Sequence, residues 1–150
     1  MRAFQFKLER LLSLRKYRER ELEIRLAEAT GRCVRFTREI EERNVRKVQS
    51  LGTALRGDTV EEYLDIHRYI KRLDQEIERK SAELTAAEQT RKEIQADYLE
   101  ASRERKVLDN LKTKREAEYR KAQKVEDVKQ IDDINTGRAA RVRPAAELES

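Results

Sequence analysis

The residues best suited to chemistry in this sequence are a single histidine, His67, and a single cysteine, Cys33. A zinc site needs about four Cys, His or carboxylate ligands, and a thiolate nucleophile needs a base beside it. Cys33 falls among apolar residues at coiled-coil spacing, which favours a small packed side chain, and His67 lies beside such a position. The sequence has neither a GxxxxGK[ST] nor a GxGxxG phosphate loop. We therefore expect no enzyme activity, no metal site and no cofactor.

The composition favours long exposed helices over a globular core. Charged residues make up 43% of the 150 residues and hydrophobic ones 37%, whereas about 25% charge is usual in soluble domains. Glu, Lys, Arg, Ala, Leu and Gln form helices well, and the chain has four glycines and one proline. No run of about 18 apolar residues is present that would predict a transmembrane helix. With its single cysteine, the chain is expected to be cytoplasmic.

The second half carries the clearest periodic pattern. Stepping by alternating three and four residues from Tyr63 meets eleven apolar or aromatic side chains in fourteen positions. Three positions are cationic, and their long stems can lie over the seam or set its register. A period of 3.5 residues sustained over more than six heptads predicts a coiled coil. The positions are Tyr63, Ile66, Ile70, Leu73, Ile77, Lys80, Leu84, Ala87, Arg91, Ile94, Tyr98, Ala101, Arg105 and Leu108.

The first half of the chain carries a shorter seam. Its apolar residues predict that the seam shifts by one residue between Ile40 and Val48. The shift has the character of a stutter. The predicted positions are Leu22, Leu26, Ala29, Cys33, Phe36 and Ile40, followed after the shift by Val48, Leu51 and Leu55.

A break between the two seams predicts a helical hairpin. Gly57 can take a positive φ to close the first helix, and Thr59 with Glu62 has capping-box spacing, with Asp58 as an alternative cap. Two helices joined by a short loop pack antiparallel. We predict an all-α protein: a hairpin over 1–131 with helices at about 8–53 and 60–131 and a loop at about 54–59. Residues 132–150 are predicted to form a flexible tail.

Two groups of apolar residues lie where this hairpin does not need them. Tyr69 is off the seam, next to Ile70, and is expected to be at least half exposed as a candidate partner contact. Phe4, Phe6 and Leu8 lie where the longer second helix has lost its partner, so they can cap that helix or bind another protein. Residues 1–50 have a net charge of +6, residues 51–100 of −4 and residues 101–150 of +3. A basic end that binds an acidic protein partner fits this distribution better than nucleic acid does.

The chain resembles the flagellar FliJ family of type III export proteins. The resemblance rests on the opening FQFKLERLLSLRKYRERELE, on VEEYLDIHRYIKRLDQEI after the loop, on the length and on the loose charged end. It implies an antiparallel coiled coil similar to the central stalk of rotary ATPases. It also implies three partners: the hexameric ring of the export ATPase, the export-gate membrane protein and empty export chaperones. The protein would then be monomeric when free and lie at the inner face of the membrane at the flagellar base.

The resemblance also assigns contacts to residues. The family's gate-binding patch matches Tyr69 and Leu73 here, whereas Glu76 and Lys80 depart from the family's usual Ala and His. The ring contact is expected at Phe4, Phe6, Leu8 and Leu11. Three alternatives remain open: the stalk of a virulence-type secretion system, a generic coiled-coil scaffold, and a basic nucleic-acid-binding rod.

Overall fold

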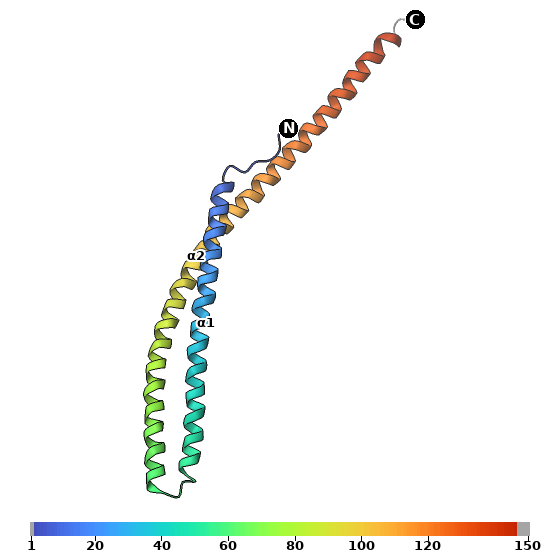
Figure 1. Cartoon of the computed structure of the whole chain (residues 1–150). Coiled ribbons are helices and arrows are strands. Elements are labelled where there is room, and N and C mark those ends of the chain that lie inside the picture. The colour runs from blue at the N-terminus through green and yellow to red at the C-terminus, as the bar shows by residue number, and fades with distance from the viewer. Residues whose placement is uncertain (1, 147–150) are drawn as a thin grey trace. The chain divides into compact units, whose positions relative to one another are not determined.

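Two long helices make up the protein, α1 (Glu9–Ala54) and α2 (Val60–Ala146) (Figure 1). The structure is a computed structural model that describes residues 2–146, with side chains described to residue 142. No strand occurs among these residues. The chain divides into two compact units, a hairpin unit (residues 15–103) and a terminal unit (residues 1–14 and 104–150). The predicted all-α class is confirmed.

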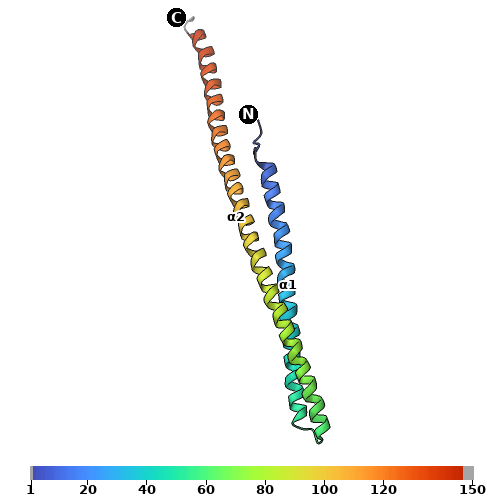
Figure 2. The ribbon, with the colours of Figure 1, turned by 90° about the vertical axis from the view of Figure 1, so that its left-hand side faces the viewer.

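The hairpin unit is an antiparallel pair of helices. α1 and α2 lie side by side in both ribbon views (Figures 1 and 2). On α2, every predicted seam position from Ile66 to Ala101 is buried or half-buried, and only Tyr63, beside the loop, is exposed. The predicted coiled-coil hairpin is therefore confirmed. Its most buried apolar residues are Leu22, Ala29, Cys33, Ile70, Leu73 and Ala101.

The predicted shift in the α1 seam is wrong. Val48, Leu51 and Leu55 are exposed, and the seam instead continues in step through half-buried residues. Long Arg and Lys side chains can cover apolar neighbours with their stems while their charges bind acids across the interface. The continued seam consists of Ile40, Arg43, Lys47, Ser50 and Ala54.

The loop closes without a left-handed residue. None of the four glycines has a positive φ, so the conformation predicted for Gly57 is wrong. The last turn of α1 tightens instead, because the amides of Arg56 and Gly57 bond the carbonyls three residues earlier, at 3.1 and 3.4 Å. The cap of α2 is as predicted, since the Glu62 amide donates to Thr59 Oγ1 at 3.3 Å.

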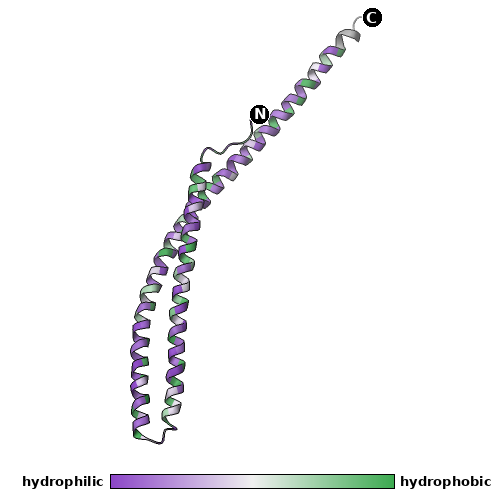
Figure 3. Cartoon of the chain, viewed as in Figure 1, coloured by the Kyte–Doolittle hydropathy of each residue, from purple (hydrophilic) through white to green (hydrophobic). Residues whose placement is uncertain are grey.

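The terminal unit joins the first turns of α1 to the later part of α2. Residues 2–6 have no regular structure, and α1 begins at Glu9, whose amide donates to the Phe6 carbonyl at 3.1 Å. Hydrophilic residues predominate along α2 in this unit (Figure 3). No helix in the described part of the chain is both long enough and apolar enough to cross a membrane.

α2 continues beyond its predicted end. The sequence predicted a helix to about residue 131, whereas α2 runs to Ala146. Residues 132–142 are all exposed, so local propensity rather than packing supports this stretch. Thr136 adds a local bond, its hydroxyl donating to the Asp132 carbonyl at 2.8 Å. Of the predicted flexible tail, 132–146 is therefore helical, and 147–150 lie outside the described residues.

Candidate functional site

The first candidate site is the face of α2 that follows the loop. Tyr69 is 39% exposed, somewhat less than the half expected from its position off the seam. Leu73, one turn further, is 2% exposed and packs in the seam. Of this pair, therefore, only Tyr69 offers surface to a partner while the hairpin is closed.

A cluster around Lys80 borders this face and joins the two helices. The Lys80 ammonium lies 2.8 Å from Glu39 Oε2 and 5.5 Å from the centre of the Phe36 ring. The contact with Lys80 lowers the pKa of the Glu39 carboxyl, and the contact with Glu39 raises the pKa of Lys80, in each case against a smaller opposing effect of burial. This seam cation is thus paired across the coil and helps to set which residues face each other.

Two further ion pairs cross the hairpin nearer the loop. Arg43 Nε lies 2.9 Å from Glu76 Oε2, and Lys47 Nζ lies 2.6 Å from Asp74 Oδ1. Glu76 and Lys80, the two positions that depart from the family pattern, are therefore both occupied in pairs between the helices. Glu76, two turns after Tyr69, is thus already paired within the chain.

The lowered pKa of Glu39 predicts an acid-sensitive contribution to hairpin stability. A carboxyl whose pKa is lower in the folded protein stabilises it above its ordinary pKa and loses this effect as the pH falls through the folded value. Glu39→Gln should therefore lower the melting temperature by a few degrees at pH 7 and have almost no effect at pH 3. Circular dichroism melts at both pH values test this. Glu41→Gln, at an exposed acid on the same helix, is the matched control, and equal behaviour of the two variants would contradict the prediction.

The second candidate site is the N-terminal segment, residues 2–12, which belongs to the terminal unit. The Phe4 and Tyr119 rings contact each other with centroids 5.7 Å apart, and the Tyr119 hydroxyl donates to the Arg2 carbonyl. Lys112 Nζ lies 2.9 Å from Glu9, and this contact raises the pKa of Lys112. The segment is thus tied to α2 by an aromatic contact, a hydrogen bond and an ion pair.

The apolar residues of this segment differ in what they present to solvent. Leu12 is fully buried, at 0% exposure, whereas Leu8 and Leu11 are each 38% exposed. Phe4 and Phe6 are half-buried, and both line a shallow groove with Lys7 and Lys112. The four residues predicted for ring contact therefore lie together at the start of α1 and just before it, and all retain some exposed surface.

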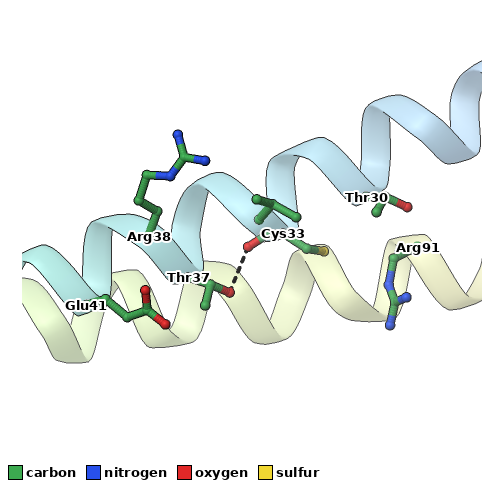
Figure 4. Close-up of a pocket in the computed structure, with 7 residues that line it drawn as sticks. Thr30, Cys33, Thr37, Arg38, Glu41 and Arg91 are labelled. Carbon is green, nitrogen blue, oxygen red and sulfur yellow. Dashed lines mark hydrogen bonds between the residues drawn. The ribbon is translucent and has the colours of Figure 1, made fainter.

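Cys33 packs in the seam, and His67 lies on the surface of α2. Cys33 is buried, at the edge of a groove lined by Thr30, Thr37, Arg38, Glu41 and Arg91 (Figure 4). The Thr37 hydroxyl donates to the Cys33 carbonyl at 2.9 Å, so this hydroxyl has its hydrogen-bond partner one turn away in α1. His67 is exposed and stacks on Tyr63, with ring centroids 6.3 Å apart. The described residues include no cluster of three His, Cys, Asp or Glu side chains able to hold a metal ion.

Sequence reasoning missed four structural partners of these sites. Arg43 and Lys47 lie at heptad spacing from Ile40, and Leu12 lies at heptad spacing back from Leu22, so continuing the period through charged residues would have found all three. Tyr119, which packs on Phe4, lies on the α2 period continued eleven residues past Leu108, so the same extension would have found it.

Comparison with known proteins identifies a family. The protein-family model described as "Flagellar FliJ protein" matches residues 4–143 of the chain. No curated protein and no solved structure gives a significant match. The matched region includes both candidate sites and nearly all of both helices. The chain therefore belongs to the flagellar FliJ protein family, a group of non-catalytic components of flagellar protein export.

Proposed function

We propose that the protein is the stalk of the flagellar export ATPase. In this role it inserts into the hexameric ATPase ring, contacts the export-gate membrane protein and escorts empty export chaperones, at the inner face of the cell membrane at the flagellar base. The observation that carries the proposal is a hairpin whose two helices cover each other's seam over many heptads. Such a hairpin needs no second chain to complete its core, so the protein is monomeric when free and presents a stiff body to a ring.

The ring contact is assigned to the N-terminal segment. Leu8 and Leu11 expose apolar surface at the start of α1, beside the half-buried Phe4 and Phe6. Basic residues accompany them, including Lys7 and Arg10 in the adjacent groove. An apolar patch with basic neighbours suits an acidic, partly apolar protein surface.

The ring contact predicts a loss of ATPase stimulation without loss of fold. The double variant Leu8→Asp/Leu11→Asp should reduce stimulation of the purified ATPase about tenfold or more, because charges replace an exposed apolar contact. Leu14→Asp is the matched control, since Leu14 is exposed one turn further along α1 and is assigned to no contact. Equal stimulation by wild type and double variant, at normal helix content, would contradict the assignment.

Deleting residues 2–7 separates ring contact from simple packing. Phe4 packs on Tyr119, so the segment also covers α2. Lost stimulation at an unchanged melting temperature supports the ring contact. A lowered melting temperature with full stimulation per folded molecule shows that Phe4 and Phe6 only cover α2.

A further inference from the structure

The middle of the hairpin unit lacks the charged contacts that join its helices nearer the loop. The ion pairs that cross between α1 and α2 near the loop all lie within residues 39–47 and 74–80. Among the described residues, no ion pair or side-chain hydrogen bond crosses between residues 20–35 of α1 and residues 84–103 of α2. In this middle part of the hairpin, packing in the seam holds the helices together.

Small side chains and one arginine make up the seam at the centre of this part. Ala29 and Cys33 of α1 are buried there, and α2 contributes the half-buried Ala87 and Arg91. A groove of about 390 Å³ lies at this level, lined by residues of α1 and by Arg91 (Figure 4). Small side chains bury little apolar area and make few dispersion contacts. This level therefore stabilises the hairpin less than levels built from Leu and Ile.

Arg91 has no acid to pair with. Its Nε atom is buried without a hydrogen-bond partner, and no described acidic residue forms an ion pair with it. The ion pair between Lys47 and Asp74 shows how the helices are aligned. Moving 17 residues away from the loop along each helix brings Thr30 opposite Arg91, and both line the same groove. The Thr30 hydroxyl donates instead to the Leu26 carbonyl at 2.8 Å. A buried polar group without a partner weakens the seam here.

Both helices are also locally weakened at this level. The hydroxyls of four threonines each donate to the carbonyl one turn earlier, at 2.8–3.1 Å. Such bonds slightly destabilise a helix and often bend it. Gly31 lies in the same stretch of α1, and a Cβ added to it would meet nothing within 4 Å, so packing does not require this glycine. Glycine inside a helix weakens it relative to alanine. The four threonines are Thr30 and Thr37 in α1 and Thr85 and Thr90 in α2.

We propose that the hairpin has a hinge at the level of Arg91, formed by residues 29–37 of α1 and 85–94 of α2. There the two helices separate and bend locally, while the ion-paired part nearer the loop stays closed. Leu22 and Ala101 are buried on the other side of the hinge, so packed seam residues flank it on both sides. The loop end of the hairpin can then change direction without unfolding. The hinge is a property of the free chain and does not depend on the proposed stalk role.

Hydrogen exchange of the free, full-length protein measures local opening. Backbone amides in residues 29–37 and 85–94 should exchange at least about tenfold faster than those in residues 39–47 and 73–80, after correction for intrinsic rates. All four stretches are helical, so the comparison reports how often each part of the hairpin opens. Equal exchange in the two parts, or slower exchange at the hinge, would overturn the proposal.

Replacing the seam arginine should stabilise the hinge. Arg91→Leu exchanges a cation without an acid for an apolar side chain, so exchange of residues 85–94 should slow about tenfold and the melting temperature should rise. Lys80→Leu is the matched control, since it removes a seam cation that pairs with Glu39 and should lower the melting temperature. A fall in melting temperature for Arg91→Leu as well would show that Arg91 supports the seam, and would contradict the hinge.

Supplying the missing acid tests the geometry directly. Thr30→Glu places a carboxylate opposite Arg91, whereas Thr30→Gln gives a side chain of similar length and helix propensity without the charge. Thr30→Glu should slow exchange at the hinge about threefold more than Thr30→Gln does. This difference should disappear when Arg91→Gln is added to both variants. Equal exchange of the two Thr30 variants in the presence of Arg91 would overturn the proposed arrangement.

Discussion

Leu73→Ala is expected to destabilise the hairpin by about 2–4 kcal/mol, because it leaves a cavity in the seam. Leu73 is 2% exposed and lies where α1 contributes mostly the stems of Arg43 and Lys47, so few apolar neighbours can move in to fill the space. Small domains have about 5–15 kcal/mol of total stability, so the loss should be plain in urea denaturation followed by circular dichroism.

Leu64→Ala is the matched control for this experiment. Leu64 lies on the same helix but is exposed, so its truncation should cost well under about 1 kcal/mol. Similar losses from the two variants would mean that Leu73 is not part of the core.

Tyr69→Ala is expected to weaken binding to the export-gate protein about thirtyfold, which corresponds to about 2 kcal/mol. Tyr69 is 39% exposed, so its ring offers aromatic surface that a partner can bury. Because the side chain lies off the seam, helix content and melting temperature should stay close to those of the wild type. Titration of the purified cytoplasmic part of the gate protein measures the effect, and a swimming assay measures its consequence.

Tyr63→Ala is the control for Tyr69→Ala, since Tyr63 is an exposed tyrosine two turns earlier on the same helix. Equal loss of gate binding by both variants would indicate a general aromatic effect rather than a site at Tyr69. If Tyr69→Ala unfolds the hairpin, Tyr69 is a core residue and the assignment fails.

Most of the hairpin could be predicted from the sequence because the buried face of α2 consists mainly of apolar residues. From Ile66 to Ala101 the period of 3.5 residues is visible without knowing the partner helix. On α1 the same reasoning failed beyond Ile40, because it preferred the apolar Val48 and Leu51 to the charged Arg43 and Lys47. Only the positions of Glu76 and Asp74 on the other helix show that the charged residues are the buried ones.

The candidate sites were predictable in place but not in contacts. The position of Tyr69 beside the seam predicts that its side chain is partly exposed. The exposed fraction of Leu73, in contrast, depends on which α1 side chains cover it. Likewise, the N-terminal aromatics were expected near α2, but the choice of Tyr119 as the partner of Phe4 depends on how an irregular segment turns, which periodicity does not describe.

Two of the ion pairs between α1 and α2, Lys80–Glu39 and Lys47–Asp74, also bear on how the helices resist sliding past each other. A slip by one heptad would keep apolar layers in contact, so apolar residues alone discriminate against it weakly. After such a slip, Lys80 would face Arg32 or Arg46 in place of Glu39, and Lys47 would face His67 or Ser81 in place of Asp74. Neither lysine would then have an acid opposite it. Sliding one helix of the hairpin along the other therefore requires both contacts to break. The two ion pairs thus transmit a force applied along one helix to the other helix.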